Sequence, residues 1–439
     1  MGIRLRAIAE RLRSSLFFVP MVLVVVGGLV GQLMVGVDSS VDGGVDSLPF
    51  FLTSTVDSAR EVLSVVAAAT ITFAGIAFSV SLLVIQQASS QYSPRVVHSL
   101  FRDPFNRRVM GAVVGTFTYC LIVLRAVRGP LEDSGEPVIP NLSVGVAVIL
   151  GVMAILAIVA FIDHNAHSME VSEILGRVTD TTVEQIERCW PDRRDEPDGI
   201  AVDDSVPSGP GHVLTFTASG WLQQVDEAAL MEAVPPGGTL RLETAVGRYA
   251  IRGTPLGTVW PAAAVPEGAE AAAADAIQLG RVRTMQQDPS YGIRQLVDVA
   301  LVALSPGVND PTTAQEAIFH LAQVIREGFV RDLPPPVTTH EDGRRIIHGE
   351  APTHEALLAL AFAEIRRSAA PHPAVNTYLL EALHLVHRSM LAEGLGDRAA
   401  AVRAVAERVV EGSAGADVDR EDREAVAEAF AHRFGPGPA

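Results

Sequence analysis

The stretch VLSVVAAATITFAGIAFSVSLLVIQQ, residues 62–87, contains no charged side chain. A helix needs about 20 apolar residues to cross a hydrocarbon core roughly 30 Å thick, so this stretch is long enough to span a membrane. Three further apolar stretches precede residue 163, and nothing like them follows. The four predicted spans cover approximately residues 15–37, 62–86, 109–126 and 142–162. The sequence therefore predicts a membrane domain of four transmembrane helices over residues 1–162.

Arginines flank these spans unevenly. Four of them precede the first span, and the loop between the second and third spans holds four more, whereas the first loop is mainly acidic. Basic residues beside spans stay on the cytoplasmic side, so we expect a multi-pass protein of the bacterial inner (cytoplasmic) membrane with both termini in the cytoplasm. The first span has no small-x-small cleavage site, which favours a retained helix over a signal peptide.

The formal net charge of −17 falls on the C-terminal part of the chain. Residues 1–162 hold 11 arginines and 10 acidic residues, whereas residues 163–439 hold 23 arginines and 41 acidic residues. An acidic surface argues against nucleic acid as a partner, since nucleic acid binds basic patches, and against broad docking on an anionic leaflet. The charge either serves solubility or concentrates cations near a pore mouth.

The chain contains no lysine, so all 34 basic side chains are arginines. A phosphate-binding P-loop requires lysine and is excluded, and neither G-x-S-x-G, H-E-x-x-H nor a Rossmann fingerprint occurs in a suitable context. Cys120 and Cys189 are the only cysteines, which excludes a disulfide framework and a C-x-x-C metal motif. We therefore expect no enzyme activity and no cofactor.

Periodicity and composition divide the remaining residues. Helical spacing of apolar residues continues beyond the fourth span and predicts an extension of that helix over residues 163–190. A linker rich in Pro, Asp and Gly follows over residues 191–211, and alternating stretches split by glycines predict a small β-module over residues 212–262. Residues 263–411 predict a helical domain that contains a loop at residues 331–350. Residues 412–439 predict a flexible tail with one possible short helix at residues 421–432.

The predicted fold class is therefore a membrane α-helical domain with four transmembrane helices, followed by a cytoplasmic α+β region. That region consists of a small β-module and a mainly helical domain.

Small and polar side chains recur along one face of the second span. Spacings of three, four and seven residues bring them to the same side of a helix. Such faces let helices approach closely in lipid and would form a helix–helix seam. The alternative is a pore-lining face, where polar groups contact water. Ala68 belongs to this face, and the pore-lining candidates are Thr72, Gly75, Ser79, Gln86 and Ser90.

His164 and His167 follow the fourth span three residues apart on the same predicted helix, next to Asp163. Histidines at this spacing are typical of a metal or proton site. Two histidines do not complete a zinc tetrahedron, so the alternative is a polar cap that packs against neighbouring helices. No metal is assigned, and these two histidines are the candidates for one.

The most distinctive part of the C-terminal half is GRVRTMQQDPSYGIRQLVDVALVALSPGVNDPTTA, residues 280–314. Its two Asp-Pro pairs predict helix starts, because Asp caps helix N-termini and Pro is tolerated at the first position. Together with SSQYSPR at residues 89–95, and Phe161-Ile162 with His164, this segment resembles a bacterial "predicted membrane protein" family that carries domain of unknown function 2254. The resemblance covers about residues 10–410. It implies four spans, a small β-module and a helical cytoplasmic domain, and no reaction.

The polar residues of these signature segments have two interpretations. Buried ion pairs fix helix packing and often look like sites, whereas two capped helix N-termini aimed at one place would bind an anion. The candidates for a structural network or a ligand pocket are Gln91, Pro94, Arg95, His164, Arg281, Arg283, Asp288, Tyr291, Arg294, Asp298, Ser305, Asn309 and Asp310.

These observations favour a homo-oligomeric channel or transport protein in the lipid bilayer. The second span would line a path for an ion or small solute, and the cytoplasmic domain would assemble and gate it. The apolar core of each span lacks charged residues, which argues against a proton-coupled pump. The alternative is a membrane-anchored sensor or scaffold whose cytoplasmic domain binds a ligand or partner.

Overall fold

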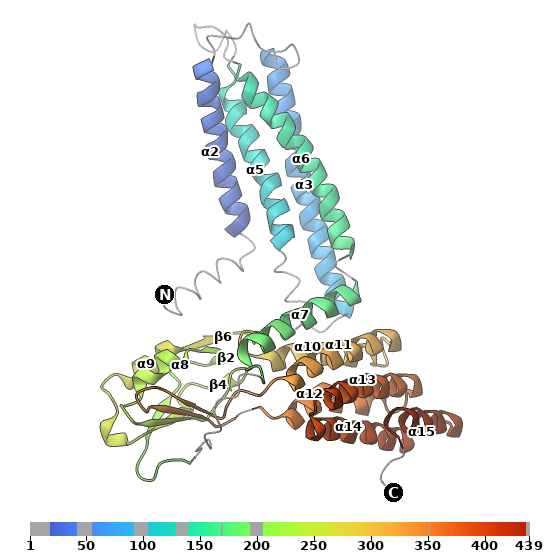
Figure 1. Cartoon of the computed structure of the whole chain (residues 1–439). Coiled ribbons are helices and arrows are strands. Elements are labelled where there is room, and N and C mark those ends of the chain that lie inside the picture. Colours follow the sequence, from blue (N-terminus) through green and yellow to red (C-terminus); the bar gives the residue numbers. More distant parts are fainter. Residues whose placement is uncertain are drawn as a thin grey trace. The chain divides into compact units, whose positions relative to one another are not determined.

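A computed structural model of the chain describes residues 18–41, 55–91, 104–128, 139–167, 170–193, 205–350 and 352–435. The chain divides into two compact units, an N-terminal one that ends at residue 170 and a C-terminal one over residues 171–439. The N-terminal unit contains four long helices, and the C-terminal unit contains two sheets and a layered set of helices (Figure 1).

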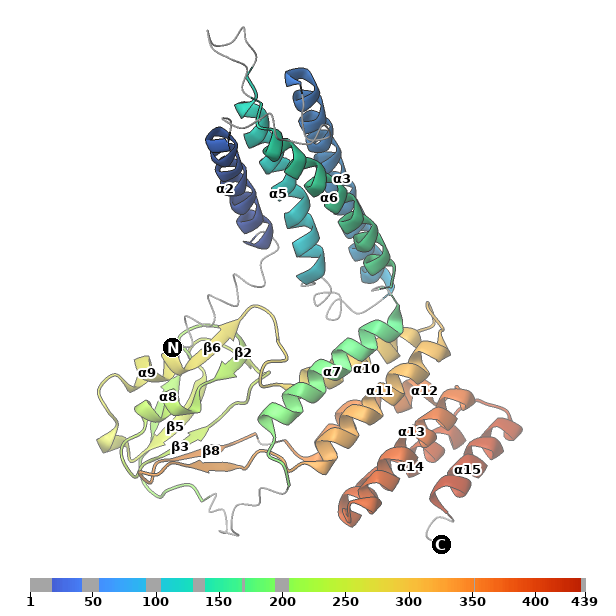
Figure 2. The ribbon, with the colours of Figure 1, turned by 45° about the horizontal axis from the view of Figure 1, so that its top comes forward.

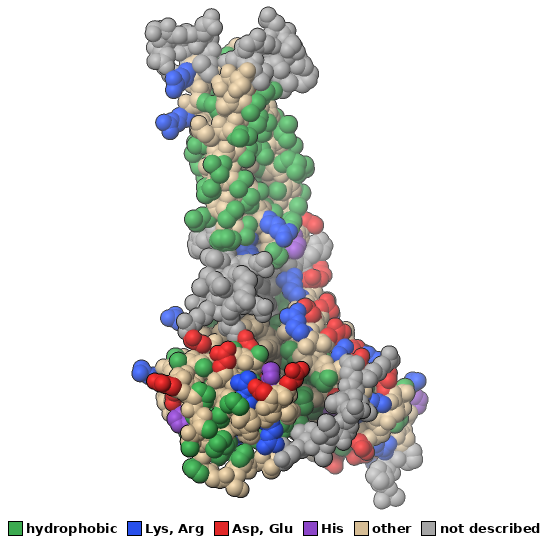
Figure 3. Space-filling view, turned by 60° about the vertical axis from the view of Figure 1, so that its left-hand side comes forward, with side chains coloured by type: hydrophobic (Ala, Val, Ile, Leu, Met, Phe, Trp, Pro, Cys, Tyr) green, Lys and Arg blue, Asp and Glu red, His purple; other side chains and the backbone are tan. Residues whose placement is uncertain are grey.

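The described residues of the N-terminal unit form the helices α2 (Phe18–Val41), α3 (Val56–Gln91), α5 (Pro104–Ala126) and α6 (Asn141–His167). Each is long and apolar enough to cross a membrane, so the four predicted spans are confirmed. α5 begins at Pro104, earlier than the predicted third span, because the first turn of a helix tolerates the missing N–H of proline. Between charged side chains near its two ends, the bundle surface seen in Figure 3 is mainly hydrophobic.

α5 contacts all three other helices of the bundle and packs most extensively on α2. A Cβ atom on Gly27 of α2 would lie 2.3 Å from the carbonyl oxygen of Gly115 on α5, and one on Gly115 would lie 2.8 Å from the carbonyl oxygen of Leu23. Gly31 and Gly111 complete a G-x-x-x-G pattern on each helix. Such glycines let two backbones touch, which drives helix association in lipid, where apolar burial gives no driving force.

Hydrogen bonds to neighbouring helices hold α6 at both of its ends. Asp38 near the end of α2 accepts hydrogen bonds from the backbone N–H groups of Leu142 and Ser143, both at 2.9 Å, and from the Ser143 hydroxyl. It thereby caps the N-terminus of α6 from a different helix. At the other end of α6, the side-chain amides of Asn165 and Asn106 on α5 donate to each other at 3.1 Å.

The next helix, α7 (Val171–Cys189), belongs to the C-terminal unit. α6 ends at His167 and Glu170 is not helical, so α7 is a separate helix; residues 168–169 lie outside the described residues. The prediction of one helix over residues 163–190 is corrected accordingly. The apolar spacing has a different cause, because Ile174, Leu175, Val178 and Ile186 are buried where α7 packs on α10 (Pro289–Ala303) and α11 (Pro311–Val330) (Figure 2).

Eight strands in the described residues form two sheets. The five-stranded sheet has the order β1 (His212–Thr215), β5 (Pro255–Trp260), β3 (Thr239–Leu242), β8 (Arg345–His348) and β7 (Val337–Thr339). The three-stranded sheet has the order β4 (Tyr249–Ala250), β2 (Gly220–Val225) and β6 (Ile277–Gly280). All neighbours are antiparallel except β3 and β8, which run parallel with Leu240 opposite Ile346.

The β-module is larger than the sequence pattern indicates. Residues 331–350, predicted as a loop, supply β7 and β8, and β6 lies beyond the predicted end at residue 262. The parallel partner of β3 comes from far along the chain, a non-local pairing that local periodicity does not reveal. The short helices α8 (Glu227–Leu230) and α9 (Ala269–Ala276) add to a core that includes Leu214, Leu240, Val259 and Ile346.

Helices α10 and α11 continue into α12 (His354–Ala369), α13 (Pro373–Ala392) and α14 (Gly396–Ala414), which pack on one another in the predicted helical domain (Figure 2). Prolines occupy the first turns of α10, α11 and α13, where they cost no backbone hydrogen bond. The apolar side chains of α10 and α11 face inward, and Leu296 and Leu321 are fully buried.

The predicted flexible tail contains a further helix, α15 (Arg420–Phe434), that packs on α13 and α14. Val426, Phe430 and Phe434, each four residues apart, are at most 9% exposed. The ring of Phe434 lies edge-on to His384 and His387 of α13, with centroid distances of 5.4 and 5.3 Å. α15 coincides with the possible short helix at residues 421–432, and the prediction of a flexible tail is corrected over this helix, because three apolar side chains at helical spacing are enough to bury one face of an otherwise polar segment.

Candidate functional site

The signature segment begins as the connection between β6 and α10. Gln287 adopts a left-handed backbone with φ of 55°. Its side-chain amide accepts a hydrogen bond from the N–H of Val225 at 2.9 Å and donates to the carbonyl of Val225 at 3.2 Å. The side chain thus takes the place of a strand partner for the end of β2, which fixes the start of α10 against the three-stranded sheet.

Arg283, Asp288 and Tyr291 form a compact cluster at this connection. Arg283 donates from Nε and Nη2 to the two carboxylate oxygens of Asp288 at 2.7 and 3.1 Å. Its guanidinium carbon lies 5.2 Å from the centre of the Tyr291 ring. The two-pronged ion pair fixes orientation as well as charge, and the ring adds a cation–π contact.

This ion pair is enclosed by the protein. The side chain of Asp288 is 4% exposed and that of Arg283 is 25% exposed. Burial raises the pKa of Asp288, and this effect outweighs the hydrogen bonds and charge of Arg283 that lower it. A Cβ atom on Gly247, whose φ is 87°, would lie 2.2 Å from a carboxylate oxygen of Asp288. The turn before β4 therefore closes directly over the carboxylate, and glycine is required there.

Arg294 links α10 to α12. It donates from Nε to Asp298 at 2.8 Å, one turn further along α10, and from Nη1 to Glu364 of α12 at 2.5 Å. The hydrogen bond to Glu364 is the main cause that raises the pKa of Arg294 above its ordinary value. Asp298 is only 6% exposed. The three side chains therefore bridge two packed helices.

Asp310 caps the helix that it precedes. Its carboxylate accepts hydrogen bonds from the N–H groups of Thr312 and Thr313 at 3.2 and 3.1 Å, and from the Thr313 hydroxyl at 2.6 Å. The Thr313 hydroxyl is the main cause that lowers the pKa of Asp310. In the same turn Asn309 is exposed with φ of 48°, and the Ser305 hydroxyl donates to a carbonyl of α10 at 2.6 Å.

This geometry favours the structural network over the anion pocket. The N-terminus of α11 already binds the carboxylate of Asp310, and the carboxylate of Asp288 binds Arg283. Arg281 lies exposed at the surface. Within the described part of the chain, no group of three or more His, Cys, Asp or Glu side chains could hold a metal ion.

α3 turns its polar face away from its own bundle. Thr72, Gly75, Ser79 and Gln86 are exposed, and a Cβ atom on Gly75 would meet nothing within 4 Å. Thr70 is two residues from Thr72, about 200° around the helix, and belongs to the face that packs on α5 and α6. The residues of that packed face are at most 6% exposed and include Leu63, Ala67, Thr70 and Ala77.

The hydroxyls of this face bond to their own helix. Thr72 donates to the carbonyl of Ala68 at 2.7 Å, and Ser79 donates to the carbonyl of Gly75 at 3.0 Å. Each hydroxyl oxygen keeps acceptor capacity after donating its hydrogen. The exposed face therefore offers small gaps and hydrogen-bond acceptors to whatever lies beside α3.

The remaining candidates belong to the sequence at the C-terminal end of α3 and just beyond it, or to the last turn of α6. The side chains of Ser90, Gln91 and His167 fall outside the described residues, as do Pro94 and Arg95 entirely. The His164 ring lies 4.6 Å from the ring of Phe105 on α5, tilted by 48°. That contact is the packing expected of a polar cap.

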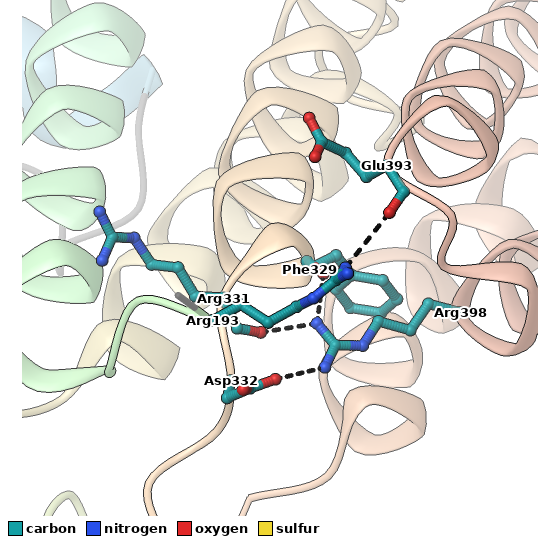
Figure 4. A network of polar contacts seen from close by, with 6 residues as sticks. All are labelled: Arg193, Phe329, Arg331, Asp332, Glu393 and Arg398. Carbon is teal, nitrogen blue, oxygen red and sulfur yellow. Dashed lines mark hydrogen bonds and ion pairs between the residues drawn. The ribbon is translucent and has the colours of Figure 1, made fainter. Parts of the chain in front are cut away.

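Arg398, in the first turn of α14, was not among the residues that the sequence singled out. Its Nη1 donates to the carbonyls of Phe329 and Arg331 at 2.6 and 2.7 Å, and its Nη2 donates to Asp332 at 2.7 Å (Figure 4). The guanidinium satisfies carbonyls at the end of α11 and complements the negative end of that helix. No local pattern marks such a residue, because its partners come from another helix.

Residues 13–384 match the family described as "Predicted membrane protein (DUF2254)". The chain belongs to the DUF2254 family. The match runs from the N-terminal unit into α13 and includes all three segments that carry the resemblance. Similar proteins include uncharacterized proteins of Mycobacterium tuberculosis (strain H37Rv) and Mycobacterium bovis, each 33% identical over 391 residues, which is 87% of this chain and 74% of the relative. No solved structure matches this DUF2254 chain.

Proposed function

We propose that this DUF2254 protein assembles as a homo-oligomer in which α3 of each copy lines a path for an ion or small solute. The observation that carries the proposal is the direction of the polar face of α3, which points away from the helices of its own chain. Exposed large apolar side chains lie on α2, where Met21, Leu29 and Leu33 are 65–67% exposed, and also on α3, where Ile76 and Leu83 are 49% and 62% exposed. Lipid contact suits α2, and water or another copy suits the polar face of α3.

The length of α3 supports the same arrangement. Its 36 residues extend about 54 Å at 1.5 Å per residue, well beyond a hydrocarbon core of roughly 30 Å. Hydrocarbon offers no hydrogen bonds to polar side chains. Packing the polar faces of several copies around one axis removes them from lipid and gives each hydroxyl a neighbour or a water.

The charge distribution supports the orientation and the role of the C-terminal unit. The arginines beside the spans favour cytoplasmic termini in a bacterial inner membrane. The C-terminal unit would then place its excess of acidic side chains beside the cytoplasmic mouth, where a negative field raises the local concentration of cations. In this arrangement the C-terminal units assemble the oligomer and gate it.

The experiment that tests conduction uses the purified full-length protein in planar lipid bilayers. Thr72→Trp and Ser79→Trp add a bulky ring to the polar face of α3, whereas Leu29→Trp adds the same ring at an exposed apolar position of α2. We expect discrete currents for the wild type and for Leu29→Trp, and altered or abolished currents for the other two variants. Silence of the wild type across ions, voltage and pH would refute conduction and favour the membrane-anchored sensor or scaffold.

Cross-linking tests the oligomer separately from the current. Thr72→Cys and Leu29→Cys are introduced in a background that carries Cys120→Ala and Cys189→Ser. We expect cross-linked oligomers from Thr72→Cys in native membranes and none from Leu29→Cys. Cross-linking at Thr72→Cys without any current would make the polar face of α3 a helix–helix seam and would end the channel proposal.

A further inference from the structure

The C-terminal unit is acidic as a whole, but three of its segments contain no Asp or Glu. They are residues 205–225, 244–266 and 276–287. Between them they carry β1, β2, β4, β5 and β6. Their basic side chains include four arginines: Arg248, Arg252, Arg281 and Arg283. Because β2, β4 and β6 form one sheet, the whole of this sheet lies in segments without Asp or Glu.

One side of this three-stranded sheet carries two aromatic rings. Trp221 of β2 pairs in register with Tyr249 of β4, and their rings meet edge to face at 5.5 Å. Ile251 directly follows β4, and Arg281 and Val282 directly follow β6, whose last residue Gly280 is opposite Trp221. Of the intervening residues, Ala250 belongs to the core of the module, Leu279 packs against that core, and Leu222 is 1% exposed.

This side, the β2–β4–β6 face, is open to solvent in the C-terminal unit. Tyr249, Ile251 and Val282 are 56%, 57% and 42% exposed. Arg252 follows Ile251 directly, Arg281 precedes Val282 directly, and both arginines are exposed. Arg248 and Arg283 pair with Glu350 and Asp288. Across the described ranges no ion pair engages Arg252 or Arg281.

We propose that the β2–β4–β6 face docks on the anionic headgroup surface of the membrane that anchors the protein. Tyrosine and tryptophan favour the boundary between water and hydrocarbon, because their rings are apolar and their tips polar. Arginine binds lipid phosphate with a planar, two-pronged donor group. The face carries the aromatic rings, the exposed Arg252 and Arg281 follow the ends of its strands β4 and β6, and β2, β4 and β6 contain no carboxylate that would repel an anionic headgroup.

The covalent link to α6 keeps the C-terminal unit close to the bilayer, so the lipid surface is always available as a binding partner. α6 ends at His167 and α7 begins at Val171, so the C-terminal unit cannot leave the membrane surface. A tethered contact forms at a high effective concentration and needs little intrinsic affinity. The acidic remainder of the unit is repelled by the same anionic surface, which turns the β2–β4–β6 face toward the headgroups.

A second copy of the chain fits this face less well. A symmetric contact would place the same patch against itself. Arg252 and Arg281 of both copies would then be brought together, with no carboxylate in the facing segments to separate them. The positive charge of the arginines is therefore matched better by anionic lipid headgroups than by a second copy of the chain.

The test uses the full-length protein in lipid nanodiscs, in the background with Cys120→Ala and Cys189→Ser. An environment-sensitive fluorophore is attached at Ile251→Cys, or at Glu428→Cys on the exposed side of α15 as the control position. The lipid is either phosphatidylcholine alone or phosphatidylcholine mixed with phosphatidylglycerol, each with a quencher placed near the headgroup. We expect quenching at Ile251→Cys to rise several-fold with phosphatidylglycerol, while quenching at Glu428→Cys stays low in both lipids.

Charge reversal provides the matched comparison. Arg252→Glu with Arg281→Glu should return quenching at Ile251→Cys to its value in phosphatidylcholine, and added salt should do the same because it screens exposed charges. Arg420→Glu with Arg423→Glu, which makes the same change on α15, should leave quenching unchanged. Equal quenching at the two label positions, or quenching indifferent to phosphatidylglycerol, would overturn the proposal. The proposal would also be overturned if the probe were shielded from solvent in detergent and this shielding grew with protein concentration, because such shielding indicates a contact between copies of the chain.

Discussion

Replacing Arg283 with alanine is expected to lower the free energy of unfolding of the C-terminal unit by about 3–5 kcal/mol, the usual cost of leaving one charge of a buried pair without its partner. Replacing Asp288 with alanine should cost less, roughly 1–3 kcal/mol. The difference follows from exposure, because Asp288 is 4% exposed and Arg283 is 25% exposed. A stranded Arg283 can turn toward water, whereas a stranded Asp288 stays enclosed under Gly247.

The pH dependence gives this prediction a second test. Burial already raises the pKa of Asp288 above its ordinary value with Arg283 in place, and loss of Arg283 raises it further. A carboxyl with a raised pKa in the folded state contributes stability that is present below its unfolded pKa, about 3.9, and lost as the pH rises through the folded pKa. The penalty of Arg283→Ala should therefore be largest near neutral pH and shrink on acidification toward pH ~4.

The assay exploits the positions of the three tryptophans. Trp190, Trp221 and Trp260 all lie in the C-terminal unit, so their fluorescence during urea unfolding in detergent reports on that unit alone. Arg281→Ala, which removes an exposed arginine two residues away, is the control and should change stability by less than about 0.5 kcal/mol. The reasoning is refuted if Asp288→Ala costs more than Arg283→Ala, or if the penalty of Arg283→Ala is the same at every pH.

Three further changes test other parts of the fold. Gly115→Val should separate α2 from α5 and cost about 1–3 kcal/mol in detergent unfolding followed by circular dichroism of the helices, whereas Gly36→Val, with nothing within 4 Å, should be tolerated. Asp38→Ala removes the cap of α6 and should cost about 1–2 kcal/mol in the same assay; no change would show that water replaces the cap. Burial lowers the pKa of His384 and of His387, so the stability of α15 is present above the unfolded histidine pKa of about 6.5 and lost as the pH falls through the folded values. Cleavage of α15 by a protease should accordingly increase on acidification. Replacing both His384 and His387 with leucine should remove this pH dependence. The positive charges of Arg388, Arg403 and Arg433 lie near the two rings and also oppose protonation of the histidines.

Local sequence patterns account for the elements of this protein. A run of apolar residues has only one way to satisfy its backbone in lipid, so the four spans could be predicted from hydropathy alone. Asp310 binds its own helix terminus, and Pro289 and Pro311 occupy first helical positions. These starts depend on neighbours within a few residues, and they appear in the structure where the sequence placed them.

Partners distant in the chain were decided only by the tertiary structure. The parallel pairing of β8 with β3, the capping of α6 by Asp38 and the binding of Arg398 to the end of α11 all join segments with no shared local pattern. The same holds for α3, whose polar face was visible in the sequence but whose direction was not. Periodicity states which residues share a side of a helix, whereas only the packing of Thr70, Leu63 and Ala77 on neighbouring helices decides which side is turned outward.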